Sequence, residues 1–315
     1  MESNTNPDLK SISKILENEN SELVIDVISK FKDSYSPNDL ILIYNDMLSK
    51  AQNPDVIMYL IRCIDEYRDK SSLEYLADIL LLKNGNYQDE DIKEKYTNVR
   101  VMCAKAIANQ KNTDYVSTLL YCLNNKDENY RVRLACADGL GKIGDRFAVA
   151  PLIDVVKDEE EKSVYVRESA VSALGLLGDN RAIDPLVSIL ETKQGIMDKF
   201  SFLKERIIEA LNKMGFSSDE RVFKALKCSL SDESAQVRID AIEGIMNSDN
   251  PKSYDIIKEC MVSDTDEEVK KNALIALYNL SDRSILDEVI NSDKYSNELK
   301  SSAIKIINEY EEENE

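Results

Sequence analysis

Two neighbouring stretches decide the fold of this chain: VRLACADGLGKIGDRFAVAPLIDVVKD at residues 132–158, and VRESAVSALGLLGDNRAIDPLVSILET at residues 166–192. Both place apolar, small and polar residues in the same order, 34 positions apart. Copies of this pattern follow one another along the 315 residues at intervals of 30–43 positions. A repeat of this length is typical of a solenoid of helix pairs. The equivalent first positions are Leu23, Val56, Val99, Val132, Val166, Leu203, Val237, Val269 and Leu299.

The spacing inside each copy predicts a first helix. Apolar or small residues stand at offsets 0, 4, 7 and 8 from the first position, and these offsets mark one face of an α-helix. In the copy that begins at Val132, the offsets hold Cys136, Gly139 and Leu140. Small side chains at offsets 4 and 7 allow a neighbouring helix to approach closely.

The helix ends are marked in the same register. A short polar residue three positions before the start is a good N-cap, because its side-chain oxygen accepts a hydrogen bond from the first turn. Glycine at offset 12 suits the left-handed turn that ends a helix. The predicted N-caps are Asn20, Asn53, Asn129, Ser163, Ser234, Asp266 and Ser296, and the glycines are Gly144, Gly178 and Gly215.

A second helix follows in each copy, with an apolar stripe of its own such as Ala148, Leu152 and Val156. One helix pair cannot bury its apolar face alone, but a stack of pairs forms a continuous core. We therefore predict an all-α fold, an α-solenoid of about eight to nine stacked helix pairs.

The pattern resembles the HEAT repeat family, and specifically the HEAT-like repeats of phycobilisome lyases. The residues that carry the resemblance are VRLACADGLGKIGDRFAVAPLIDVV and VRESAVSALGLLGDNRAIDPLVSIL. The resemblance is close over 99–290, looser at 56–64 and weak at 20–31. It implies a right-handed α-solenoid whose second helices line the concave side, and it implies little about chemistry.

The repeats predict four segments along the chain. Residues 1–19 form an N-terminal extension and first helix, and residues 20–98 form irregular HEAT-like repeats with a charged insertion near 83–95. Residues 99–310 form the regular repeat array, and residues 311–315 form an acidic, solvated tail.

Composition excludes several classes of protein. The formal net charge is −19 without a dense run of Lys or Arg, so we expect neither nucleic acid nor a membrane surface as a partner. The chain has no histidine, which excludes Ser-His-Asp triads and histidine-ligated zinc or iron. The six cysteines lack CxxC spacing and are interpreted as reduced core residues. Without a signal sequence or a long apolar window, we expect a cytoplasmic protein.

Charged residues recur with the period of the core. A basic residue follows the first position in seven copies, and an acidic residue lies five positions before it in six. Two interpretations are open: a row that binds an anionic ligand, or a ladder of charge-assisted hydrogen bonds between neighbouring repeats. We favour the ladder, because the charges repeat with the core positions. Its predicted members are Arg100, Arg133, Arg167, Arg238, Asp127, Asp198, Asp232 and Asp264.

The exposed face of the second helices is the predicted binding surface. An acidic groove with scattered aromatic residues suits a basic peptide or protein segment, although a solvated wall can have the same composition. None of the acidic runs has the ligand spacing of a calcium-binding loop, and we predict no catalytic, cofactor-binding or metal-binding residues. The predicted partner-binding residues are Tyr121, Asp154, Asp184, Ser188, Phe223, Lys227, Asp255, Glu259 and Asp287.

Two functions remain open. The favoured hypothesis is a non-catalytic protein–protein interaction scaffold that presents a concave, acidic second-helix surface to a basic protein or peptide. The alternative, which only the resemblance implies, is a phycobilin lyase-type enzyme or lyase subunit that acts on a chromophore-carrying protein. Deoxyhypusine hydroxylase activity is excluded, because that HEAT-like family uses histidines for its di-iron centre and this chain has none.

Overall fold

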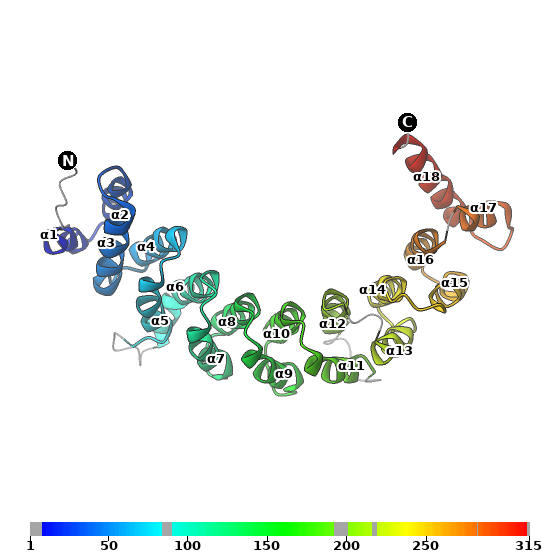
Figure 1. The fold of residues 1–315 in the computed structure, drawn as a ribbon, viewed down its shortest axis with the longest axis horizontal. Helices are drawn as coiled ribbons and strands as arrows, with labels where there is room; N and C mark the ends of the chain where they lie inside the picture. Colours follow the sequence, from blue (N-terminus) through cyan, green and yellow to red (C-terminus); the bar gives the residue numbers. More distant parts are fainter. Residues whose placement is uncertain (1–7, 84–89, 192–200, 216–218, 282, 314–315) are drawn as a thin grey trace. The chain divides into compact units, whose positions relative to one another are not determined.

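The computed structural model describes residues 8–83, 90–191, 201–215, 219–281 and 283–313. Within these ranges all regular structure is helical and no strand occurs (Figure 1). The chain divides into two compact units, Met1–Ala173 and Leu174–Glu315, and the division falls inside helix α10.

Unit 1 begins with the short helix α1 (Leu9–Ser13) and continues with alternating first and second helices. Its first helices are α2 (Ser21–Ser29), α4 (Pro54–Tyr67), α6 (Glu90–Asn109), α8 (Tyr130–Ile143) and α10 (Val164–Leu177). Its second helices are α3 (Pro37–Lys50), α5 (Leu73–Leu80), α7 (Val116–Asn124) and α9 (Val149–Lys157).

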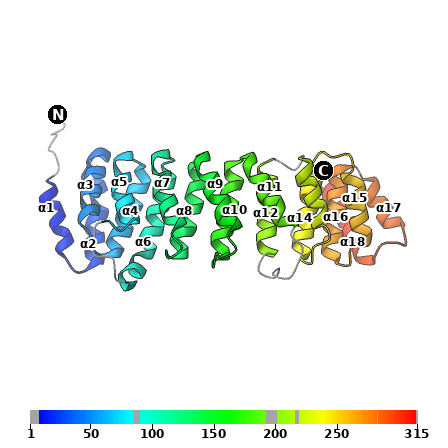
Figure 2. The ribbon, with the colours of Figure 1, turned by 90° about the horizontal axis from the view of Figure 1, so that it is seen from below.

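Unit 2 continues the same alternation. Its second helices are α11 (Ile183–Glu191), α13 (Glu220–Ser229), α15 (Ser253–Ser263) and α17 (Ser284–Asn291). Its first helices are α12 (Ser201–Lys213), α14 (Ala235–Met246), α16 (Glu267–Leu280) and α18 (Asn297–Glu313). Figure 2 shows the helices of each unit side by side. The prediction of stacked helix pairs is confirmed, with α2–α17 forming eight pairs among the described residues.

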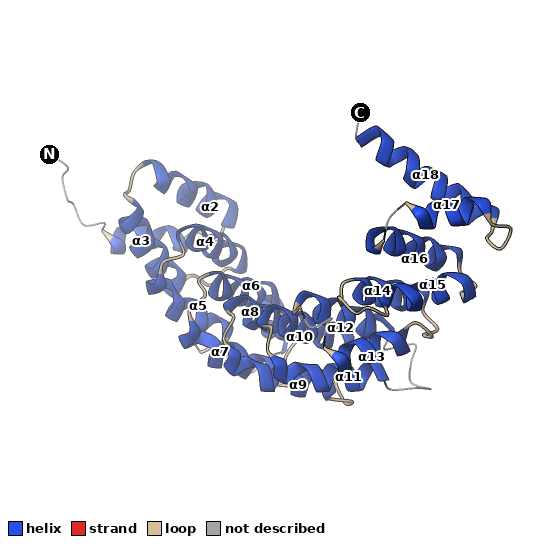
Figure 3. Cartoon of the chain, turned by 45° about the vertical axis from the view of Figure 1, so that its right-hand side comes forward, coloured by secondary structure: helices blue, strands red, loops and turns tan. Residues whose placement is uncertain are grey.

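Each unit, taken by itself, curves so that the first helices lie on its inner side (Figures 1 and 3). We call α4, α6, α8 and α10 the inner row of unit 1, and α12, α14 and α16 the inner row of unit 2. The outer row consists of the second helices α5, α7 and α9 in unit 1, and α11, α13, α15 and α17 in unit 2. The expectation that second helices line the concave side is therefore wrong.

Small residues allow neighbouring first helices to approach one another closely. A Cβ atom on Gly139 of α8 would lie 3.2 Å from Cβ of Ala108 in α6. In unit 2, a Cβ atom on Gly175 would lie 3.1 Å from Cα of Ala210 in α12. We call these close contacts between neighbouring first helices the seams. They leave little room for larger side chains.

The helix ends follow the predicted punctuation. The side chain of Asn129 accepts a hydrogen bond from the backbone N–H of Arg131 (2.9 Å) and caps α8. Gly144 ends the same helix with a φ of 85°, and Gly178 ends α10 with a φ of 59°. This left-handed region disfavours residues that carry a Cβ atom.

The first position of each copy is buried in all copies but the first. Val132 and Val166 are fully buried, as are their equivalents from Val56 onward. Leu23, by contrast, is 54% exposed, while its neighbour Val24 is 2% exposed. The register in the first copy is therefore shifted by one residue, and Val24 with Ile28 forms the buried face of α2.

Parts of two predicted features lie outside the described residues. Residues 84–89 of the charged insertion do so, whereas residues 90–95 belong to the start of α6. Residues 314–315 of the acidic tail also lie outside, whereas α18 continues to Glu313. Among the described helices, none combines the length and the apolar character needed to cross a bilayer.

Candidate functional site

The charge ladder is seen most completely at Arg133 of α8. Its guanidinium donates to both carboxylate oxygens of Glu161, with N···O distances of 3.0 and 2.6 Å. Its Nε also donates to the carbonyl of Leu123 at the end of α7 (2.8 Å). Glu161 in turn accepts a hydrogen bond from the backbone N–H of Ser163, just before α10 (3.0 Å). One ion pair thus ties together the ends of three helices.

The same arrangement recurs in both units. Arg238 donates to both carboxylate oxygens of Asp264 (2.8 and 3.1 Å), and Lys204 pairs with Asp232 (2.5 Å). Arg167 donates from Nε and Nη2 to the carbonyl of Val156 (3.0 and 2.8 Å). Its predicted acidic counterpart, Asp198, lies outside the described residues.

One predicted member of the ladder is wrong. Arg100 pairs with Glu128 (2.8 and 2.5 Å) and not with Asp127. The side chain of Asn125 accepts a hydrogen bond from the backbone N–H of Asp127 (3.1 Å), and this turn leaves Asp127 exposed. The side chain of Glu128, which is longer than that of Asp127, then reaches the guanidinium of Arg100.

The charged side chains of the ladder are engaged in ion pairs and hydrogen bonds inside the stack. Arg100, Arg133 and Arg167 are all less than 10% exposed. Burial alone would raise the pKa of Glu161, but the hydrogen bonds from Arg133 and from the amide of Ser163 outweigh it and hold the pKa below its usual range. A row of cations engaged in this way supports a structural interpretation over an anion-binding one.

The predicted partner-binding residues lie on the outer row. Tyr121 on α7 is 69% exposed, and Asp154 on α9 is also exposed. Phe223 on α13 is the exception, because its ring packs into the core and is only 9% exposed, so it is not available as an exposed anchor. The other members are all exposed: Asp184, Ser188, Lys227, Asp255, Glu259 and Asp287.

Basic side chains interrupt the acidic character of the outer row in unit 2. Arg221 of α13 pairs with Asp184 of α11 (2.6 Å). Lys258 of α15 pairs with Glu288 of α17 (2.7 Å). The outer row therefore presents mixed charge, and its aromatic content in this unit is lower than the sequence predicts.

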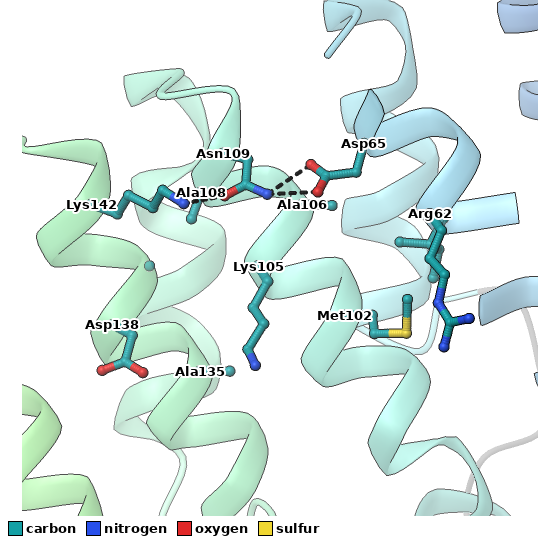
Figure 4. Close-up of a pocket in the computed structure, with 12 residues that line it drawn as sticks. Arg62, Asp65, Met102, Lys105, Ala106, Ala108, Asn109, Ala135, Asp138 and Lys142 are labelled. Carbon is teal, nitrogen blue, oxygen red and sulfur yellow. Dashed lines mark hydrogen bonds between the residues drawn. The ribbon is translucent and has the colours of Figure 1, made fainter. Parts of the chain in front are cut away.

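A cleft opens on the inner row of unit 1, between α4, α6 and α8 (Figure 4). Its volume is about 380 Å³, within the range of roughly 300–1,000 Å³ that is common for ligand sites. Its walls combine apolar and charged side chains. The lining residues are Ile61, Arg62, Asp65, Met102, Lys105, Ala106, Ala108, Asn109, Ala135, Asp138, Gly139 and Lys142.

A polar bridge crosses one side of the cleft. The side-chain amide of Asn109 donates to both carboxylate oxygens of Asp65 (2.8 and 2.7 Å). Lys142 donates to the carbonyl oxygen of the same amide. Arg62 and Lys105 extend from α4 and α6 beside Met102, away from this bridge (Figure 4).

Two exposed tyrosines lie at the starts of the neighbouring inner helices. Tyr130 begins α8 and Tyr165 lies in the first turn of α10, with exposures of 47% and 61%. Their ring centroids are 6.3 Å apart. Tyr165 and Ser172 are seven residues apart in the sequence and therefore lie on the same face of α10.

Sequence reasoning missed the cleft, although a signal for it was present. Arg62, Lys105 and Asp138 all stand at offset 6 of their copies, between the apolar offsets 4 and 7. A charged residue recurring at one offset marks the solvent-facing stripe of the first helices. This stripe is not part of the predicted binding surface, which lies on the second helices.

These features define the chain as a helical-repeat solenoid, with small residues at the seams and a ladder of buried ion pairs. The chain belongs to the HEAT repeat proteins. The model of HEAT repeats matches residues 92–165 and 197–278, and that of the PBS lyase HEAT-like repeat matches residues 166–192. Among curated proteins, none matches the sequence.

Several solved structures are similar to this chain. The karyopherin Kap121p bound to the SUMO protease Ulp1p has 14% identity and a TM-score of 0.55, and the match covers 94% of this chain and 36% of the karyopherin. Kap121p bound to Nup53p has 13% identity and a TM-score of 0.54, and the match covers 94% of this chain and 36% of that one. The CpcE–CpcF complex of phycocyanin lyase from Nostoc has 21% identity and a TM-score of 0.43, covering 76% of this chain and 87% of that one. At these identities the karyopherin match shows a shared fold.

Proposed function

We propose that this chain is a non-catalytic scaffold that binds a protein or peptide partner on the inner row of unit 1. The cleft between α4, α6 and α8 supports this proposal, because it combines an apolar floor with two exposed cations, Arg62 and Lys105, that form no ion pair with another described residue. Binding energy at protein interfaces concentrates where an anchor residue fills such a desolvated pocket. Tyr130 and Tyr165 offer exposed aromatic area on the same row.

Chemistry supports binding over catalysis. Among the described residues, no group of three or more Cys, Asp or Glu side chains is arranged to hold a metal ion. Five of the six cysteines are buried, and the exposed Cys228 lies on the outer row. The phycobilin lyase alternative stays a prediction that rests on the repeat pattern alone.

Steric blocking of the cleft tests the proposal. Met102→Trp places a large ring on the floor of the cleft without a change of charge, and Ala150→Trp adds the same ring to the exposed surface of α9. Each immobilised protein is incubated at low salt with an extract of the source cells, and the retained proteins are quantified by mass spectrometry. We expect Met102→Trp to lose a partner that wild type and Ala150→Trp retain. Equal recovery of every partner by all three proteins contradicts the proposal.

The outer row is a second candidate surface, for a basic partner. Asp154, Asp255 and Asp287 are exposed, and none forms an ion pair with another described residue. A variant with Asp154, Asp184, Asp255 and Asp287 changed to Asn would lose a basic partner that binds there. Retention of all partners by this variant, together with their loss from Met102→Trp, assigns binding to the inner row.

A further inference from the structure

We propose that the cleft of unit 1 binds an acidic, partly apolar segment of the partner protein, whose carboxylate pairs with Arg62 and Lys105. This inference rests on the proposed function and gives the partner's contacting segment a charge opposite to the one predicted from the sequence. It depends on the balance of charge inside the cleft and on the nature of its floor.

Positive charge in the cleft is not balanced by ion pairs. Neither Arg62 nor Lys105 forms an ion pair with another described residue, and both are exposed. Lys142 donates to the amide oxygen of Asn109, which carries no formal charge. Elsewhere in unit 1, Arg100 and Arg133 form ion pairs with Glu128 and Glu161. The cleft therefore holds cations that an incoming carboxylate can engage.

The two acidic residues of the cleft, Asp65 and Asp138, form no ion pair with Arg62 or Lys105. Both oxygens of Asp65 accept hydrogen bonds from Asn109, at 2.8 and 2.7 Å. Burial raises the pKa of Asp138, and neither the Ser169 hydroxyl nor the charge of Lys105 overcomes this effect. The three cations of the lining, Arg62, Lys105 and Lys142, outnumber its two carboxylates, so the cleft has an excess of positive formal charge.

The floor of the cleft adds a requirement for apolar contact. Ile61, Ala106 and Ala135 are buried there, and Met102 lies between the two offset-6 cations of α4 and α6 (Figure 4). Met adapts its shape to varied apolar partners. An aliphatic side chain next to a Glu or Asp would fill this floor while the carboxylate meets Arg62, whose planar guanidinium suits bidentate pairing. A basic segment would be repelled by the same cations.

Fluorescence anisotropy with defined peptides tests this inference. The probe is a fluorescein-labelled, glycine-spaced peptide with alternating Glu and Leu residues. Its controls carry Gln or Lys in place of Glu. The full-length chain is compared with Arg62→Glu/Lys105→Glu and with Lys157→Glu, which reverses an exposed charge on α9 of the same unit. Circular dichroism melts check that each variant is folded.

We expect the Glu–Leu peptide alone to bind, more weakly as salt is raised. The double variant should weaken binding by about tenfold or more, whereas Lys157→Glu should bind as wild type does. Equal binding of the Gln peptide, tighter binding of the Lys peptide, or an unchanged affinity of the double variant overturns the inference. Binding of free succinate without binding of the peptide also overturns it. If Met102→Trp loses a cellular partner but the Glu–Leu peptide does not bind, the proposed function stands and only this inference fails.

Discussion

Glu161 exposes only 2% of its side chain and Arg133 only 6%, so their ion pair is the most desolvated of the two-residue links in the ladder. Removal of one partner from a buried pair leaves the other charge without compensation, whereas replacement of both by apolar residues of similar volume often costs little. This asymmetry makes the pair suitable for a stability experiment.

Arg133→Met should lower the free energy of unfolding by about 3–5 kcal/mol, because it strands the Glu161 carboxylate. Urea unfolding followed by circular dichroism measures the change. The control is Arg131→Met at the exposed neighbouring position, which should change stability by less than about 0.5 kcal/mol. The double variant Arg133→Met/Glu161→Leu should recover much of the loss. Equal effects of Arg133→Met and Arg131→Met would contradict a structural role for the ladder.

The ladder also makes stability depend on pH in the acidic range. Burial opposes ionisation of Glu161 and Asp264, but hydrogen bonds from Arg133 and Arg238 and from backbone amides hold both pKa values below their ordinary values of 4.5 and 3.8. A group whose pKa is lower in the folded state binds fewer protons there than in the unfolded chain. Its contribution is complete above the unfolded pKa and is lost as the pH falls through the folded pKa.

Thermal melts between about pH 7 and pH 3 check this dependence. The melting temperature should hold nearly constant down to the ordinary carboxyl range and then fall. In Glu161→Gln/Asp264→Asn the melting temperature should be lower at neutral pH and should fall less on acidification. Parallel curves for the two proteins would show that these carboxyls do not carry the effect.

Gly175→Val should destabilise the chain by about 1–3 kcal/mol through overpacking. A Cβ atom at this position would meet the main chain of Ala210 at 3.1 Å, and a helix backbone yields less readily than a side chain. Leu176→Val, at the adjacent position that is 52% exposed, is the control and should be nearly neutral. Equal melting temperatures of the two variants would mean that the seam is looser than the structure indicates.

Phe223→Ala should cost about 3–5 kcal/mol of stability, because the ring is a buried core residue of α13. Lys227→Ala, on the exposed face of the same helix, should leave stability almost unchanged. Chemical denaturation of both variants decides between a core ring and a surface anchor. A near-neutral Phe223→Ala that instead weakens partner binding would restore the surface role predicted from the sequence.

The local rules of helix formation were readable from the sequence because each depends on a few adjacent residues. Asn129 caps α8 and Gly144 ends it, as their offsets predict. The predicted register is wrong in the first copy, where two apolar residues are adjacent. Leu23 and Val24 both suit a core position, and Val24 is the one that is buried in the packing of α2. Likewise the pairing of Arg100 with Glu128 depends on the turn at Asn125, which the repeat period does not describe.

The location of the binding surface was not readable in the same way. Which row faces inward depends on whether the first or the second helices approach each other more closely, and this is a property of the stack. Gly139 was predicted as a small residue of a first helix, but its close approach to Ala108 of the neighbouring first helix depends on the stack. The cleft lies on this inner row, where three consecutive first helices contribute small residues and longer charged side chains to one lining.

The spacing of the ladder has a mechanical consequence. Its links between repeats join residues that lie 26–28 positions apart, so each link ties one repeat to the next and to none beyond. Under tension applied at one end of a unit, the load passes from link to link, and helix pairs come away in turn. A force–extension trace would then show a series of small, similar steps in place of a single rupture.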